Sequence, residues 1–191
     1  MITKKEVIAM IKNSGTKKIE TKRLILRRFK IDDVECFYNN VGNDDLIDKY
    51  VLWNKHKDKN ETETLISKWI EEYNNDFVYR WVVELKDVNE VIGSISCHKI
   101  SPKNLTCEVG YSYCSKYWNK GYATEALKVV LDYLKKEGFK TVYASHLGLN
   151  PASGKVMLKS GMQYEGTLRN RIIDKTTGEY DNLVFYSILF E

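Results

Sequence analysis

The spacing of apolar residues changes along the chain, and each spacing predicts a different kind of element. Over residues 19–29 apolar and polar residues alternate, which predicts one strand with its leucines on a shared face. Two aspartates then suit the first turn of a helix over about 32–40, because carboxylates favour the positive end of a helix. A second helix is expected over 60–73, where Asn60 and Glu63 form a capping box ahead of an apolar stripe.

The middle of the chain alternates apolar and polar residues in three successive runs, which predicts an antiparallel meander. The runs are 79–85, 91–98 and 106–113, and the segments between them are rich in turn-forming residues. The period then changes to that of a helix over 121–137, which Gly138 ends.

The last part of the chain predicts a strand, a helix and two further strands. They are expected at 141–145, 151–160, 163–168 and 183–190, with a turn at 175–178. The whole pattern predicts an α/β domain with a mixed, mainly antiparallel central sheet of about six to seven strands flanked by helices.

The first residues are expected to form a separate arm. Thr3 and Glu6 make a capping box ahead of apolar residues at helical spacing, and Gly15 ends that pattern. We therefore predict a helical arm over residues 1–18 and the main domain over residues 19–191.

Composition and charge argue against several classes of protein. The chain has 191 residues, 43% of them hydrophobic, and 30 basic against 26 acidic side chains give a net charge of +4. Basic residues never run beyond pairs, which argues against direct nucleic-acid binding. No apolar stretch approaches the ~18 residues of a membrane span, and the N-terminus lacks the apolar core of a secretory signal.

The cysteines and histidines are too scattered to predict a metal site. The four cysteines include no Cys-x-x-Cys pair, and the three histidines lack zinc-finger spacing. Free thiols are typical of a reducing compartment, so we expect a cytoplasmic protein that uses no metal.

The stretch that carries most chemical information is 108–124. It predicts a strand that ends near Cys114, a loop that contains Gly121, and a helix that begins at once. A helix start presents unpaired N–H groups and positive dipole charge, and a glycine lets a phosphate approach the backbone. The stretch is neither a Walker A loop nor a GxGxxG fingerprint. It fits either a pyrophosphate cradle or an ordinary strand–loop–helix turn that contains a glycine.

Three motifs, in matching order and spacing, resemble those of one protein family. Residues 118–123, Trp-Asn-Lys-Gly-Tyr-Ala, resemble the acetyl-CoA-binding motif of the GNAT superfamily of N-acyltransferases, Gln/Arg-x-x-Gly-x-Gly/Ala. Trp118 replaces the usual Gln or Arg, which looks like the branch of ribosomal-protein N-terminal alanine acetyltransferases (RimJ/RimL type). The segments 20–27 and 150–162 resemble the same branch. The resemblance covers residues 19–190.

This resemblance implies acetyl-CoA as cosubstrate and a set of residues that bind it. Backbone N–H groups at the helix start would hold the pyrophosphate, and the end of the preceding strand would pair with the pantetheine arm. Asn150 would hydrogen-bond the pantetheine amide. Ser153 would protonate the leaving thiolate, or it simply satisfies the start of its own helix. The implied binding residues are Tyr111, Ser112, Tyr113, Trp118, Asn119, Lys120, Gly121, Tyr122, Ala123, Thr124, Asn150 and Ser153.

Acetyl transfer also needs an amine that has lost its proton. An α-amino group has a pKa of roughly 7.7–8.0 and lysine one of about 10.4, so the α-amine costs roughly 3 kcal/mol less to deprotonate. Glu108, which begins the strand that leads to the cofactor and matches a Glu of the resembling branch, is the expected base through water. Its alternative role is a structural salt bridge, and His98 and His146 are alternative bases.

The predicted activity is acetyl transfer from acetyl-CoA to a primary amine, with a protein N-terminal α-amine favoured. A small amine or an antibiotic is the alternative acceptor for the same fold, and a non-catalytic acyl-CoA sensor is the alternative function. The loops expected to contact the acceptor, 53–60 and 175–182, contain no motif that decides between them. The resemblance allows a homodimer, and no membrane or direct nucleic-acid partner is expected.

Overall fold

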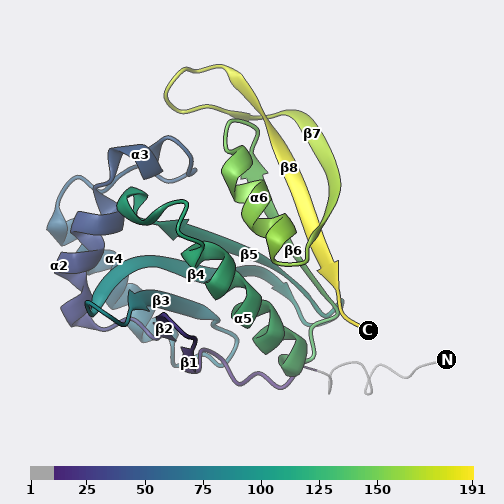
Figure 1. The fold of residues 1–191 in the computed structure, drawn as a ribbon, viewed down its shortest axis with the longest axis horizontal. Helices are drawn as coiled ribbons and strands as arrows, with labels where there is room; N and C mark the ends of the chain where they lie inside the picture. The colour runs from purple at the N-terminus through teal and green to yellow at the C-terminus, as the bar shows by residue number, and fades with distance from the viewer. Residues whose placement is uncertain (1–10) are drawn as a thin grey trace.

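The computed structural model describes residues 11–191. Its central element is one twisted eight-stranded sheet (Figure 1). The strand order is β1-β2-β3-β4-β5-β6-β8-β7. Within the described residues, β5 and β6 are the only neighbouring strands that run parallel. The strands are β1 Ile19–Glu20, β2 Leu24–Arg27, β3 Arg80–Leu85, β4 Glu90–Ser101, β5 Thr106–Tyr113, β6 Thr141–Leu147, β7 Gln163–Ile173 and β8 Tyr180–Leu189. The predicted mixed, mainly antiparallel sheet is confirmed, with a strand count slightly above the expected one.

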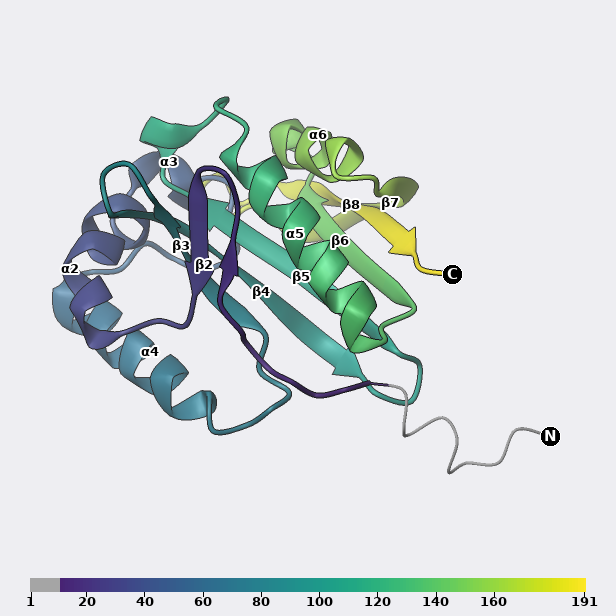
Figure 2. The same ribbon diagram turned by 60° about the horizontal axis from the view of Figure 1, so that its bottom comes forward.

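Helices cover both faces of this sheet (Figure 2). The helices α5 and α6 pack on one face with the buried leucines of β2, and α2 and α4 pack on the other through a separate apolar cluster. The α-helices are α2 Val34–Phe37, α3 Asp45–Asp48, α4 Lys59–Glu72, α5 Tyr122–Glu137 and α6 Pro151–Lys159. Short turns of other helix types are η1 Ile31–Asp33, η2 Tyr38–Gly42 and η3 Ser115–Tyr117. Within residues 11–191, none of the helices has the length and apolarity needed to cross a membrane.

Two local expectations differ from the structure because polar side chains redirect the backbone. The strand expected over 19–29 is instead the hairpin β1–β2, since the Thr21 hydroxyl accepts hydrogen bonds from the N–H groups of Arg23 and Leu24 and turns the chain. The cap of α4 is Asp58, whose carboxylate accepts from Glu61 N at 3.0 Å, and not Asn60.

The predicted N-terminal helix begins in residues 1–10, which lie outside the described residues. The described part of the predicted arm, 11–18, is not helical and hydrogen-bonds to the domain. Ser14 N donates to the Glu137 carboxylate at 2.8 Å, and the Trp81 indole N–H donates to Lys17 O at 2.7 Å. These contacts attach residues 11–18 to α5 and β3.

Candidate active site

The strands β5 and β6 separate partway along their length, and the site is built around this fork. Their backbones pair only between Thr106–Glu108 and residues 141–143. Beyond that point β5 stays paired with β4 and β6 with β8, so within residues 11–191 no strand covers the inner edge of β5. The helices α5 and α6 follow β5 and β6, so both begin at the open end (Figure 1). Ligands of open α/β sheets bind at such a position.

The turn that starts α5 presents a row of backbone N–H groups. Gly121 is the N-cap residue with φ of +80°, Asn119 has φ of +60°, and no side chain caps the helix. Glu125 N donates to Gly121 O at 3.0 Å, whereas the N–H groups of residues 119–124 find no acceptor in the part of the chain that the structure describes. Left-handed residues ahead of an uncapped helix start form a concave anion-binding surface. We call residues 119–124 the amide turn.

Trp118 fixes this turn against the strand that precedes it. Its indole N–H donates to Tyr113 O at 2.6 Å, and its ring lies 5.8 Å from that of Tyr50. Trp118 therefore contacts the protein's own backbone at the end of β5. The side chain of Tyr122 lies under the Arg23 guanidinium, 4.3 Å from ring centroid to Cζ.

A pair of hydroxyl groups joins β5 to the start of α6. Ser153 Oγ donates to Tyr111 Oη at 2.9 Å, and Tyr111 Oη donates to the Ser153 carbonyl at 3.0 Å. Burial raises the pKa of Tyr111, so its phenol stays protonated at neutral pH. The nearby Tyr113 hydroxyl is buried and has no partner within residues 11–191.

Asn150 is the N-cap of α6. Its Oδ1 accepts from Ser153 N at 3.3 Å, so its side-chain NH₂ is the group that remains to donate to a ligand. The Ser153 hydroxyl does not cap the helix, because it points to Tyr111 instead.

Glu108 lies at the vertex of the fork, where β5 and β6 make their last pair. Its Oε2 forms an ion pair with Lys99 Nζ at 2.7 Å, and its Oε1 accepts from Ser145 Oγ at 2.9 Å. The side chain is 13% exposed. Hydrogen bonding to Glu108 raises the pKa of Lys99. Glu108 therefore forms the salt bridge that was its alternative role, and the same carboxylate lies where the fork opens.

Glu108 and Ser153 are not brought together. Side chains alternate along β5, so Glu108 shares its face with Gly110 and Ser112, whereas Tyr111 and its partner Ser153 lie on the other face. The carboxylate of Glu108 and the hydroxyl of Ser153 therefore lie on opposite faces of β5.

The two histidines considered as alternative bases, His98 and His146, have different surroundings. His98 is opposite Glu108 in the β4–β5 register, and its Nε2 lies 2.9 Å from Ser96 Oγ. His146 is buried, stacks on Tyr186 and lies so close to α6 that a Cβ on Gly154 would approach its Nε2 to 2.7 Å. His146 thus packs α6 onto the sheet. Among residues 11–191, no cluster of three or more His, Cys, Asp or Glu side chains is placed to hold a metal ion.

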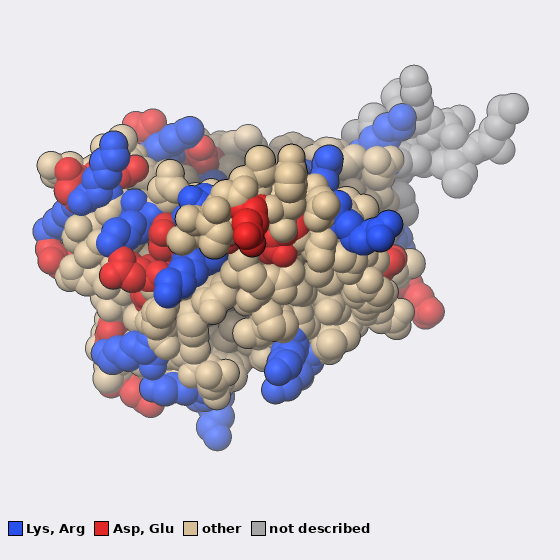
Figure 3. All heavy atoms as spheres, turned by 90° about the horizontal axis from the view of Figure 1, so that it is seen from above, with Lys and Arg blue, Asp and Glu red and all other residues tan. Residues whose placement is uncertain are grey.

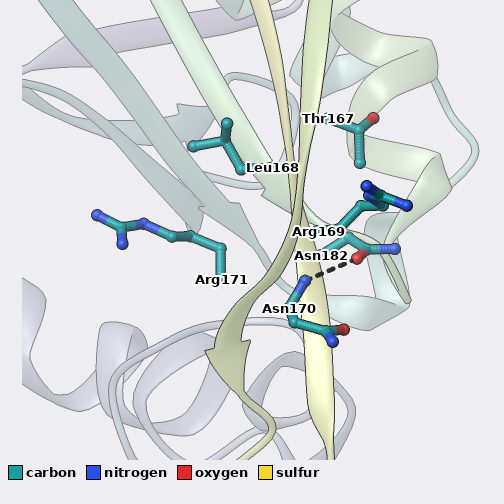
Figure 4. Close-up of a pocket in the computed structure, with 6 residues that line it drawn as sticks. All are labelled: Thr167, Leu168, Arg169, Asn170, Arg171 and Asn182. Carbon is teal, nitrogen blue, oxygen red and sulfur yellow. Dashed lines mark hydrogen bonds between the residues drawn. The ribbon is translucent and has the colours of Figure 1, made fainter.

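The loops expected to contact an acceptor meet at one point. Lys175, at the tip of the β7–β8 hairpin, forms an ion pair with Asp48 at 2.6 Å and donates to Trp53 O. An open pocket lies further down the hairpin, where Arg171 and Leu168 point to one side of β7 and Arg169 to the other (Figure 4). Acidic and basic side chains are interspersed on the face seen from above in Figure 3, with uncharged residues between them.

Comparisons with known proteins agree with this geometry. Residues 23–163 match the family model described as the acetyltransferase (GNAT) domain. The chain is 32% identical over 176 residues to the uncharacterised N-acetyltransferase YoaA of Bacillus subtilis strain 168, covering 90% of this chain and 96% of YoaA. A GNAT-family acetyltransferase structure from Bacillus anthracis superposes with a TM-score of 0.78 at 29% identity, covering 91% of this chain and 98% of that one. RimL, a ribosomal L7/L12 α-N-protein acetyltransferase in complex with coenzyme A, has the same fold, with a TM-score of 0.81 at 17% identity over 91% of this chain and 98% of RimL.

Proposed function

Because the chain belongs to the GNAT acetyltransferase family, we propose that it transfers acetyl from acetyl-CoA to a primary amine, with a protein N-terminal α-amine as the favoured acceptor. The observation that carries this proposal is the fork of β5 and β6 with the amide turn at its open end. The likeness to RimL, a ribosomal L7/L12 α-N-protein acetyltransferase in complex with coenzyme A, supports the cosubstrate and the favoured acceptor.

The residues at the fork fit acetyl-CoA. The amide turn would hold the pyrophosphate, since its N–H groups lack acceptors of their own within residues 11–191. The uncovered inner edge of β5 over 111–113 would pair with the pantetheine arm as an added strand does. The NH₂ group of Asn150 is a polar side-chain group available to that arm.

The chain's own residues would move two protons. When bound, acetyl-CoA supplies a thioester whose acetyl carbon the amine attacks as the carbon–sulfur bond breaks. Glu108 would take the proton that the amine loses, through a water molecule, and Ser153 would give a proton to the departing sulfur. Before transfer, Tyr111 would hold the Ser153 hydroxyl in place, because it accepts from that hydroxyl at 2.9 Å. The hydroxyl would then turn from Tyr111 to the sulfur to give up its one proton, and Ser153 would regain a proton from solvent.

We expect Ser153→Ala to lower kcat roughly fivefold to tenfold while the KM for acetyl-CoA changes little, since the lost proton donor acts only as the thiolate leaves. Tyr111→Phe should lower kcat less, because the ring stays and only the partner of Ser153 is lost. Steady-state kinetics measure both. Ser160→Ala is the matched control, because it removes a buried hydroxyl that has no partner within residues 11–191 from the end of the same helix. An Ser153→Ala enzyme as fast as the wild type contradicts the role of Ser153.

Calorimetric titration with acetyl-CoA tests the proposed function. Binding at micromolar to millimolar ligand is the expected result, and a flat titration over that range contradicts it. Binding without turnover on any amine would favour an acyl-CoA sensor. Turnover on small amines and not on peptides would favour the small-amine acceptor.

A further inference from the structure

One arginine from the β1–β2 hairpin contacts the amide turn and the first turn of α5 together. Arg23 Nε and Nη2 each lie 2.7 Å from Glu125 Oε2, and Arg23 Nη1 donates to Lys120 O at 3.0 Å. Its guanidinium also covers the Tyr122 ring. The other oxygen of Glu125 accepts from Thr21 Oγ1 at 2.6 Å and from Arg23 N at 3.1 Å. No other side chain of residues 11–191 donates a hydrogen bond to a backbone carbonyl of residues 119–124.

The contact with Lys120 O sets the direction in which the turn presents its N–H groups. The carbonyl of residue 120 and the N–H of residue 121 belong to one planar trans peptide and point in opposite directions. Because Arg23 draws this carbonyl toward the hairpin, the N–H of Gly121 points away from the hairpin. Gly121 can follow this geometry because its φ of +80° is open to glycine.

Glu125 would oppose an anionic ligand if it stood alone. It lies in the first turn of α5, close to the amide turn. Burial raises the pKa of Glu125, but hydrogen bonds from Thr21 and Arg23 lower it more, so the group is a carboxylate at neutral pH. An uncompensated carboxylate there would repel a pyrophosphate group at the same helix start. The Arg23 guanidinium balances that charge.

We propose that Arg23 is a positioning residue for the pyrophosphate of acetyl-CoA, acting through Lys120 O and Glu125. It orients the amide turn and cancels the only carboxylate in the first turn of α5. This inference rests on the proposed function. The proposed role concerns the pyrophosphate and not the rest of the cosubstrate. Removal of Arg23 should therefore weaken the binding only of ligands that carry phosphates.

The test compares acetyl-CoA with S-acetylpantetheine, which has the thioester and the pantetheine arm but no pyrophosphate. We expect Arg23→Ala to weaken acetyl-CoA binding roughly tenfold or more by calorimetry. The kcat/KM for S-acetylpantetheine should stay within about twofold of the wild-type value, because that substrate does not reach the amide turn. Adding Glu125→Gln to Arg23→Ala should recover several-fold of the lost affinity, because it removes the uncompensated charge.

Arg28→Ala is the matched control. Arg28 also donates to a backbone carbonyl, Thr16 O at 3.1 Å, and covers a tyrosine ring, but it lies outside the site. It should leave the affinity for acetyl-CoA unchanged. If Arg23→Ala folds poorly by circular dichroism, Arg23→Lys keeps the charge without the planar fork and should weaken acetyl-CoA binding by less than tenfold, with S-acetylpantetheine again unaffected.

Three results would overturn the inference while leaving the proposed function intact: unchanged acetyl-CoA affinity in Arg23→Ala, an equal loss for both substrates, or no recovery in the double variant. A wild-type protein that binds no acetyl-CoA would instead overturn the proposed function, and this inference with it.

Discussion

Glu108→Gln should lower kcat for acetylation of an α-amine roughly a hundredfold near pH 7, with little change in the KM for acetyl-CoA. The substitution keeps the shape of the side chain and a hydrogen bond from Ser145, but it removes the carboxylate that takes up the amine's proton. Positioned general bases are typically worth a hundredfold or more in rate. Steady-state kinetics with a saturating peptide acceptor measure the effect.

The pH dependence distinguishes a base from a structural carboxylate. An α-amine has a pKa of roughly 7.7–8.0, so it is mostly protonated below that range and mostly neutral above it. The defect of Glu108→Gln should therefore be largest at pH 6.5–7 and shrink as the pH rises past about 8, because the amine is then already neutral before it attacks and solvent can take the proton that it loses afterwards. Lys99→Met is the control: it removes the ion pair at 2.7 Å and leaves the carboxylate. A defect that is equal at every pH, or one that Lys99→Met reproduces, would assign Glu108 a structural role.

Gly121→Ala should raise the Kd for acetyl-CoA roughly tenfold to a hundredfold. A methyl group at this residue disfavours φ of +80° by about 1–2 kcal/mol, and its Cβ would lie 3.5 Å from Nη2 of Arg23, whose guanidinium contacts the amide turn. Loss of one or more hydrogen bonds to a charged group, at about 1.5–3 kcal/mol each, accounts for that range. Calorimetric titration measures the change.

Gly178→Ala controls for the backbone strain alone. Gly178 has φ of +74° in the β7–β8 turn, and a Cβ there would meet no atom within 4 Å. Both variants should lose similar stability to chemical denaturation, and only Gly121→Ala should lose affinity for acetyl-CoA. Equal affinities for the two variants would contradict the assignment of the amide turn to the pyrophosphate.

Where the apolar period is long, it predicts the fold accurately. The run of residues 106–113 is β5 to the residue, and the helical period over 121–137 is α5 with Gly121 as its cap. Where a single polar side chain determines the path of the backbone, the apolar period does not predict the element boundaries correctly. The hydroxyl of Thr21 divides an expected strand into a hairpin, and Asp58 starts α4 earlier than Asn60 would. Such choices depend on single hydrogen bonds that alternation does not encode.

The same division applies to the candidate site. The turn with Gly121 and the cap at Asn150 are local, so their positions follow from the sequence. The contact between Tyr111 and Ser153 joins residues 42 apart, and that between Arg23 and Glu125 joins residues 102 apart. Neither contact can be predicted from the spacing of residue types, because each depends on how the strands are ordered in the sheet. For Arg23, the available signal was its place in the motif at 20–27, whose role the motif alone does not give.

The most direct test of the central claim is an acetyl-transfer assay over a panel of N-terminal peptides and small amines, with products identified by mass spectrometry. With wild-type protein and acetyl-CoA, at least one primary amine should gain the mass of one acetyl group, and the favoured acceptor predicts that group on a peptide α-amine. The Glu108→Gln protein at pH 7 should form that product far more slowly. If no amine gains an acetyl group while acetyl-CoA binds, the protein is not the N-acetyltransferase proposed here.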